Sequence, residues 1–246
     1  TSGEERMIAQ RHKNILTGGT PMPYSIVTSS ICALTSVFHF EDAKRDFPFN
    51  VKVATRPEAK RDMRFFGPGI YSIYDTIDKA MIYIGIYTPT DSVIDKRYRK
   101  HLQTLTLRGT EVTFKSSAPK SAFLAKIAND RLVLDLNRCC SFDERLVKDR
   151  CVSHINKVNY AAANWNEFGN WKPGNSSMPG TETRFVFQFD KIVGGKVDKK
   201  MLQNIESRLI ACFNPLTNSS HSAALKPEYD SQDKLTEIVQ ALVSQQ

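Results

Sequence analysis

The sequence lacks a long apolar run. No stretch approaches the run of about 20 apolar residues that a helix needs to cross a bilayer. The most apolar region, residues 26–40, is interrupted by polar side chains: Thr28, Ser29, Ser30, Thr35, Ser36 and His39. No signal peptide is recognisable. We therefore expect a cytoplasmic protein with no membrane partner.

An even set of cysteines is also missing. The chain has five, at positions 32, 139, 140, 151 and 212, which fits a reducing compartment better than a disulfide framework. Cys139, Cys140, Cys151 and His154 together could hold zinc. Their spacing lacks the paired knuckles of common zinc sites, so buried or free thiols are the favoured interpretation. Internal repeats and low-complexity tracts are absent too.

What the sequence does have is an excess of positive charge. Its 246 residues are 41% hydrophobic and 24% charged, typical of a globular protein with a sizeable core. The net charge is +8 and the pI is about 9.2. This balance favours a polyanionic partner such as nucleic acid, because lysine and arginine gain affinity by releasing counterions from phosphates. Many basic proteins bind no nucleic acid, so charge alone decides nothing.

The N-terminal part is less regular. Residues 1–22 are polar and basic and are expected to form a flexible arm. We expect a helix over residues 24–40 and a strand over residues 50–55. Residues 41–66 interleave cations with phenylalanines, which could grip phosphates and stack on bases, or could form a solvated loop over the core.

Two strand-like runs dominate the middle of the chain, residues 69–74 and 82–87. Both are rich in Ile and Tyr, and the polar residues between them favour a turn, so we predict an antiparallel hairpin. Tyr71 and Tyr83 project from it, and Gly85 leaves open space of the kind a ligand backbone can approach. Ordinary cross-strand packing of two tyrosines is the plain alternative.

A helix is predicted over residues 91–105, with Asp91 or Ser92 as its N-cap. Arg97 and His101 are four residues apart and share one helical face. A guanidinium beside an imidazole suits a site that handles phosphate, although a solvated basic face explains the same pattern.

The rest of the chain adds a strand over residues 184–190 and a helix over residues 198–213. Glu206 lies at the edge of that helix's apolar stripe, where a carboxylate needs a cation or donor, and a structural salt bridge is the plain alternative. Residues 231–244 predict an amphipathic helix that packs on the core or on a second subunit. Residues 164–183 predict a long loop whose tryptophans, Trp165 and Trp171, stack on bases or simply lie on the surface.

Four motifs together resemble the GIY-YIG nuclease superfamily. They are Gly69-Ile70-Tyr71, then Tyr83-Ile84-Gly85 after eleven intervening residues, then Lys96 to His101, and last Glu206 to Ile210 followed by Asn214 to Asn218. One such motif is weak, but four in the right order are a strong signal. The chain departs from the family in two spacings: the gap before Arg97 is slightly longer than in the shortest members, and the region after His101 is much longer.

The resemblance implies an α+β fold with a small antiparallel three-stranded β-sheet flanked by helices. Residues 1–65 would be an N-terminal arm and extension, and residues 66–220 the nuclease core. Residues 108–183 would be a recognition insertion within that core. Residues 221–246 would form a C-terminal helix.

The resemblance also implies a metal-dependent DNA endonuclease that hydrolyses phosphodiester bonds, most like the type II restriction enzymes. Its partner would be double-stranded DNA, and cutting both strands suggests a homodimer or sequential nicking. The implied catalytic residues are Tyr71, Tyr83, Arg97, His101, Glu206 and Asn218. Glu206 would bind Mg²⁺ or Mn²⁺, and Tyr71 would help to deprotonate the attacking water. A repair, junction or homing nuclease, a nuclease toxin, and a non-catalytic nucleic-acid-binding protein on the same scaffold remain alternatives.

Overall fold

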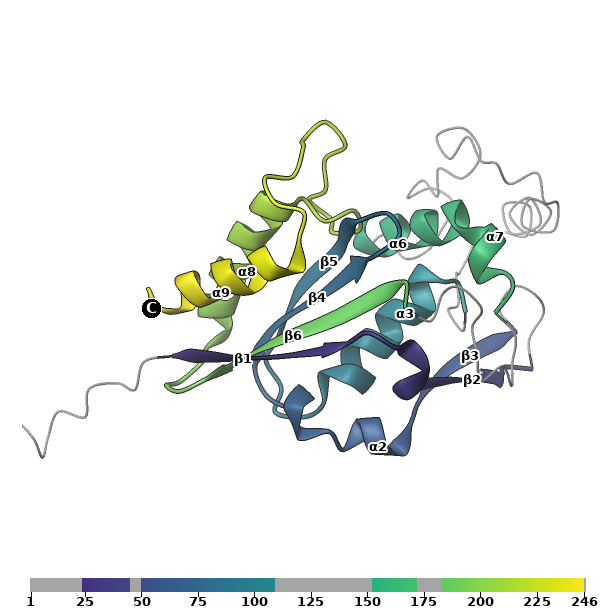
Figure 1. Cartoon of the computed structure of the whole chain (residues 1–246), viewed down its shortest axis with the longest axis horizontal. Helices are drawn as coiled ribbons and strands as arrows, with labels where there is room; N and C mark the ends of the chain where they lie inside the picture. Colours follow the sequence, from purple (N-terminus) through teal and green to yellow (C-terminus); the bar gives the residue numbers. More distant parts are fainter. Residues whose placement is uncertain (1–23, 45–49, 109–151, 172–182, 246) are drawn as a thin grey trace, which may run out of the picture.

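The computed structural model describes residues 24–44, 50–108, 152–171 and 183–245. These residues form an α+β fold with a four-stranded antiparallel sheet, a separate two-stranded sheet, and helices around them (Figure 1). The strands are β1 (Ser25–Ile31), β2 (Phe38–Asp42), β3 (Val51–Thr55), β4 (Gly69–Asp75), β5 (Ala80–Tyr87) and β6 (Phe185–Val193). The helices are α2 (Pro57–Lys60), α3 (Arg99–Leu105), α6 (Val152–Ala163), α7 (Trp165–Phe168), α8 (Lys199–Phe213) and α9 (Gln232–Val243), with short helical turns η1 (Leu34–Ser36), η2 (Met63–Phe65) and η3 (Ile94–Tyr98).

The main sheet has the strand order β1-β6-β4-β5, so the expected three-stranded sheet is wrong. The fourth strand, β1, comes from residues for which we predicted a helix. It pairs with β6 from Ser25 opposite Val193 to Ile31 opposite Phe187. The physical reason is its run of Val, Thr, Ser and Ile, since β-branched side chains suit a pleated sheet.

Each face of the main sheet is covered by different elements. One hydrophobic cluster joins Ile70 and Ile84 of the hairpin to α8 and α9. The other cluster joins Tyr71 and Ile73 to α3, β2–β3, α6 and α7. Because side chains alternate along a strand, Tyr71 faces α3 and its neighbour Ile70 faces α8.

The strongly periodic segments form where the sequence predicts them. The hairpin β4–β5, the strands β3 and β6, and the helices α8 and α9 are all confirmed. Asp198 caps α8 by accepting a hydrogen bond from the Met201 N–H at 2.7 Å, and Ser231 caps α9. The helix predicted over residues 91–105 begins as the π-helical turn η3, and neither Asp91 nor Ser92 caps it through its side chain.

Two tryptophans that could have faced nucleic acid are buried instead. Trp165 is 6% exposed and Trp171 is 3% exposed. Trp171 packs edge-on against Phe40 of β2 and Phe168 of α7. The interpretation of these rings as a base-stacking surface is therefore wrong, because they fill the core between α7 and the two-stranded sheet.

A buried ion cluster ties the start of β6 to the turn of the hairpin. Arg184 bonds to Asp75 at 2.7 Å, and both side chains are almost fully buried. Asp78 and Glu167 complete the cluster. Burial and the neighbouring groups act in opposite directions here. Burial raises the pKa of Asp75, but hydrogen bonds from Arg184 and Tyr160 and the charge of Arg184 hold it below its usual value. Removing one partner of such a cluster leaves a buried charge uncompensated.

Several predictions concern residues outside the described ranges. They are the arm over residues 1–22, most of the insertion between residues 109 and 151, and the cysteines at 139, 140 and 151. In the part of the chain that the structure describes, no helix is both long and apolar enough to cross a membrane.

Candidate active site

The hairpin brings the two predicted tyrosines together over a glycine. Tyr71 on β4 is opposite Gly85 on β5, and Ile73 is opposite Tyr83. The Tyr71 and Tyr83 rings lie 5.8 Å apart. A Cβ atom at position 85 would lie 2.7 Å from the Tyr71 Cζ and hydroxyl oxygen. The space that Gly85 leaves is therefore filled by the two tyrosine rings, not left open for a ligand backbone as we expected.

His101 on α3 adds a third ring, and with Tyr71 and Tyr83 it forms one aromatic group. The Tyr71 hydroxyl oxygen lies 3.0 Å from Nε2 of His101, within hydrogen-bonding distance. The Tyr83 and His101 rings are 4.3 Å apart. Tyr98 packs edge-on against Tyr71 from the same helical segment. An imidazole with its hydrogen on Nδ1 accepts the phenol hydrogen at Nε2.

Arg97 lies one helical turn before His101, in the π-helical turn η3. Such turns are frequent at functional sites. Its side chain is exposed, and with the described part of the chain it forms no hydrogen bond or ion pair. The guanidinium nevertheless acts on the group, because its charge lowers the pKa of Tyr71 and of His101. Arg97 is thus a cation beside a phenol and an imidazole, available to an anion.

Glu206 reaches the same group from the other face of the sheet. It lies on α8, whose residues Leu202, Ile205 and Leu209 are buried against the sheet. Its half-buried carboxylate accepts a hydrogen bond from the backbone N–H of Ile86 on β5. Its charge raises the pKa of Tyr71, so a carboxylate from α8 and a guanidinium from η3 act on one hydroxyl group.

This convergence depends on the edge position of β5. Ile84 and Ile86 flank Gly85, and both present backbone N–H groups to side chains rather than to another strand of the sheet. No side chain stands at position 85 itself. A carboxylate on one side of the edge strand can therefore act on a phenol on the other side.

Asn218 has a different environment from the other predicted residues. Its side-chain oxygen accepts the Ile84 N–H at 3.0 Å, and its amide donates to the Ile84 carbonyl at 2.8 Å. Thr217 extends this pairing through its N–H, 2.9 Å from the Ile82 carbonyl oxygen. Asn218 thus holds the backbone of β5 beside the site, and its side-chain hydrogen bonds go to Ile84 rather than to the predicted rings or charges.

Burial sets the proton affinities of the group. It raises the pKa of Tyr71 well above the ordinary value of 10.0, with a further rise from Tyr83. It lowers the pKa of His101 well below 6.5, with further lowering from Lys157 and Arg97. It also raises the pKa of Glu206. At neutral pH the site therefore holds a neutral phenol hydrogen-bonded to a neutral imidazole.

The residues present fit a divalent metal of the magnesium kind. Glu206 is a half-buried carboxylate that forms no ion pair with the described residues, so its charge is available to a cation. The described residues contain no cluster of three or more His, Cys, Asp and Glu side chains. Mg²⁺ is commonly held by one or two carboxylates and completes its shell with waters and substrate phosphates.

Sequence reasoning missed Lys157 on α6. Helix α6 runs from Val152 to Ala163, which leaves Lys157 in its middle. Its ammonium group lies 4.1 Å from the centre of the Tyr83 ring. Tyr160 and Ala161, one turn further on, are buried. A lysine in an apolar helical row was the available signal.

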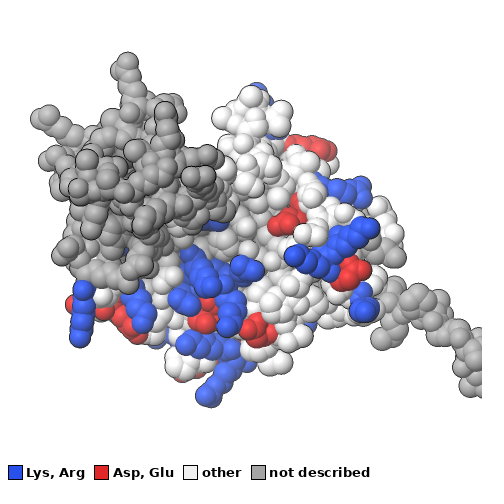
Figure 2. Space-filling model, turned by 180° about the vertical axis from the view of Figure 1, so that it is seen from behind, with Lys and Arg blue, Asp and Glu red and all other residues white. Residues whose placement is uncertain are grey.

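Basic residues gather beside this group. Figure 2 shows lysine and arginine side chains on the side of the molecule that faces away in Figure 1, near α2 and α3. The exposed cations of these segments are Lys60, Arg61, Arg64, Lys96, Arg97 and Lys100. Such a surface suits a polyanion, because its long-range field concentrates one near the site.

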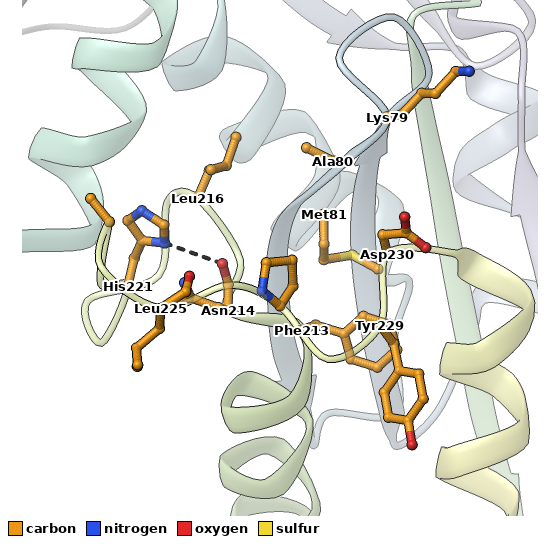
Figure 3. Close-up of a pocket in the computed structure, with 12 residues that line it drawn as sticks. Lys79, Ala80, Met81, Phe213, Asn214, Leu216, His221, Leu225, Tyr229 and Asp230 are labelled. Carbon is orange, nitrogen blue, oxygen red and sulfur yellow. Dashed lines mark hydrogen bonds between the residues drawn. The ribbon is translucent and has the colours of Figure 1, made fainter.

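A separate hollow of about 360 Å³ lies beyond the C-terminal end of α8 (Figure 3). Phe213, Met81 and Tyr229 supply much of its wall. Asn214 closes the helix with φ of 41°, and its carbonyl oxygen lies 3.1 Å from Nδ1 of His221. None of the six predicted catalytic residues lines this hollow, so it is not part of the candidate site.

The structure thus brings Tyr71, Tyr83, Arg97, His101 and Glu206 into one group and places Asn218 on the neighbouring backbone. Comparisons of the chain with models of protein families, with curated proteins and with solved structures find no match.

Proposed function

We propose that the chain is a metal-dependent DNA endonuclease of the GIY-YIG type, most like a sequence-specific type II restriction enzyme. The main support is the convergence at one edge strand of a phenol–imidazole pair, a guanidinium available to an anion, and a carboxylate that forms no ion pair with the described residues. Phosphodiester hydrolysis needs these functions: proton removal from water, neutralisation of phosphoryl charge and a metal ligand.

The proton path follows from the neutral state of the pair. Because burial raises the pKa of Tyr71, the phenol is not a free phenolate at neutral pH. Its hydroxyl oxygen takes the proton of the attacking water while its own hydrogen passes to Nε2 of His101. The hydroxide oxygen then bonds to phosphorus as the bond from phosphorus to the leaving oxygen breaks. The leaving oxygen takes the bonding electron pair and then a proton from solvent water, and His101 returns its proton to solvent.

The charged residues act on the phosphate. Arg97 neutralises the charge that develops on the non-bridging oxygens, where preorganised electrostatics contributes most. Glu206 would hold the metal, which when bound supplies the positive charge that stabilises the leaving oxygen. Tyr83 packs on His101 and so fixes the plane of the imidazole.

Single-turnover cleavage of plasmid DNA with Mg²⁺ tests these assignments. Arg97→Ala and Glu206→Ala should each abolish cleavage and retain the cooperative unfolding of the parent. Glu237→Ala, which removes an exposed carboxylate on α9, is the matched control and should cleave normally. Wild-type cleavage by either site variant contradicts the role given to that residue.

The products separate the proposed enzyme class from its alternatives. Discrete bands from a plasmid support a sequence-specific restriction enzyme. Preference for branched DNA supports a repair or junction nuclease. Binding without cleavage in Mg²⁺ or Mn²⁺ supports a non-catalytic nucleic-acid-binding protein. Linear rather than nicked product at limiting enzyme supports a homodimer on duplex DNA.

A further inference from the structure

Helix α6 belongs to the segment that the sequence assigned to DNA recognition, yet it contacts the candidate active site directly. It packs against α3, which carries His101. Asn156 on α6 donates a hydrogen bond to the backbone carbonyl of Asn218 at 3.0 Å. The next residue, Lys157, points its ammonium group at the ring of Tyr83. Two consecutive residues of α6 therefore touch two different parts of the site.

The ammonium group of Lys157 is held in place by two contacts. Its side chain is 6% exposed, which is unusual for lysine. The ammonium nitrogen lies 4.1 Å from the centre of the Tyr83 ring, a close cation–π contact. It also donates a hydrogen bond to the Ser153 hydroxyl at 2.8 Å, one turn earlier in α6. The helix and the ring together hold this charge in one place.

We propose that Lys157 is a positioning residue of this site, whose ammonium group fixes the Tyr83 ring and stands as the second cation beside the His101 imidazole. Tyr83 is the common neighbour, because its ring lies against Lys157 and against His101. Arg97 supplies the other positive charge, from the helical turn before His101. The effect of Lys157 on cleavage rests on the proposed nuclease function. Its effect on the His101 pKa does not.

The consequence concerns the protonation of His101. Its surroundings are Tyr71 on β4, Tyr83 on β5, Arg97 on η3 and Lys157 on α6. Two of these four groups are cations, and burial keeps the Tyr71 phenol neutral at neutral pH by raising its pKa. A positive charge on the imidazole, which would be the third in this cluster, is therefore disfavoured. Burial lowers the His101 pKa in the same direction. His101 then stays neutral in the resting site, and its Nε2 can accept the hydrogen bond of the Tyr71 hydroxyl.

The charge of Lys157 can be removed with little change of shape. Lys157→Met replaces the buried cation by an apolar side chain of similar length, at the loss of its hydrogen bond to the Ser153 hydroxyl. Without the ammonium group the pKa of His101 rises toward its ordinary value. The imidazole is then protonated at higher pH, and the acid limb of the cleavage profile moves to higher pH. Lys157→Arg keeps the charge and should restore the wild-type limb.

The experiment is an NMR titration of labelled histidine in the full chain, with His101→Gln used to assign the signal. We expect the His101 pKa to rise in Lys157→Met and to stay near the wild-type value in Lys157→Arg. Lys234→Met, which removes an exposed lysine on α9, is the control and should leave the titration unchanged. If Lys157→Met loses cooperative unfolding, the same titration is done with Lys157→Gln, which also removes the charge.

The outcomes separate this inference from the proposed function. An unchanged His101 titration in the charge-removing variant overturns the role of Lys157, whatever the cleavage activity. A raised His101 pKa supports the role even if the wild-type protein cleaves no DNA, in which case the nuclease proposal alone fails. In an active enzyme, an acid limb that moves with the His101 pKa supports both.

Discussion

Replacing Gly85 by alanine adds a single methyl group where the two tyrosine rings meet. The new Cβ atom would lie 2.7 Å from the Tyr71 hydroxyl oxygen and 2.8 Å from Cε1 of Tyr83. The backbone at this position needs no left-handed conformation, so the effect is one of space alone. Tyr71 has little room to move, because Tyr98 packs edge-on against its ring.

The magnitude follows from two opposing terms. Overpacking a core position costs about 1–3 kcal/mol. Alanine in place of glycine recovers about 0.4–1 kcal/mol by restricting the unfolded chain. We therefore expect a net loss between about 0 and 2.6 kcal/mol. For a domain of this size each kcal/mol lowers the Tm by about 2–4 °C.

The effect on cleavage should exceed the effect on stability. Moving the Tyr71 hydroxyl away from His101 breaks the proton path, and a displacement of about 1 Å can cost about 10²-fold in rate. Single-turnover cleavage and thermal unfolding measure the two effects. Gly195→Ala is the matched control, because its Cβ would lie 2.7 Å from a carbon of the Tyr24 ring, far from the site. Wild-type cleavage and Tm in Gly85→Ala would show that the site has room for a Cβ between the two tyrosine rings.

Three further predictions concern the pair and the edge strand. Tyr71→Phe should lose about 10²–10⁴-fold in single-turnover cleavage but only about 1 kcal/mol in urea unfolding, and normal cleavage would contradict the proton path. The pKa of His101 lies well below 6.5, and its neutral form is the acceptor. Cleavage should therefore persist as the pH falls through 6.5. A pH–rate profile with an acid limb above 6.5 would count against a neutral His101. Asn218→Ala leaves a buried N–H and carbonyl of Ile84 unpaired and should cost about 2–5 kcal/mol in urea unfolding. Folded Asn218→Ala should keep more cleavage activity than Tyr71→Phe. Lower activity in Asn218→Ala than in Tyr71→Phe would instead indicate a catalytic role for Asn218.

Local patterns predicted the elements whose stability is largely local. The β4–β5 hairpin has turn residues between two β-rich runs, and α8 and α9 have apolar side chains at helical spacing with polar caps. Those signals lie within a few residues of each other. The strand β1 was different, because its partner β6 is more than 150 residues away, and the pairing that makes these residues a strand is not visible in the nearby sequence.

The residues of the candidate site also fall into two sets: those that short motifs predict and those whose role depends on packing between distant elements. Tyr71, Arg97 and Glu206 were predicted because each lies in a short motif with its own spacing. The role of Lys157 depends on how α6 packs against α3 and Tyr83, and no short pattern encodes that packing. The tryptophans show the reverse error: polar neighbours suggested an exposed loop, but the rings fill the core.

The central claim is that one edge of the sheet gathers groups that hydrolyse DNA with a divalent metal. Incubating the purified protein with plasmid and genomic DNA, with and without Mg²⁺, and mapping the ends tests it most directly. We expect Mg²⁺-dependent cleavage at defined positions, abolished by Glu206→Ala. DNA that stays intact in both Mg²⁺ and Mn²⁺, with the protein folded, would contradict it.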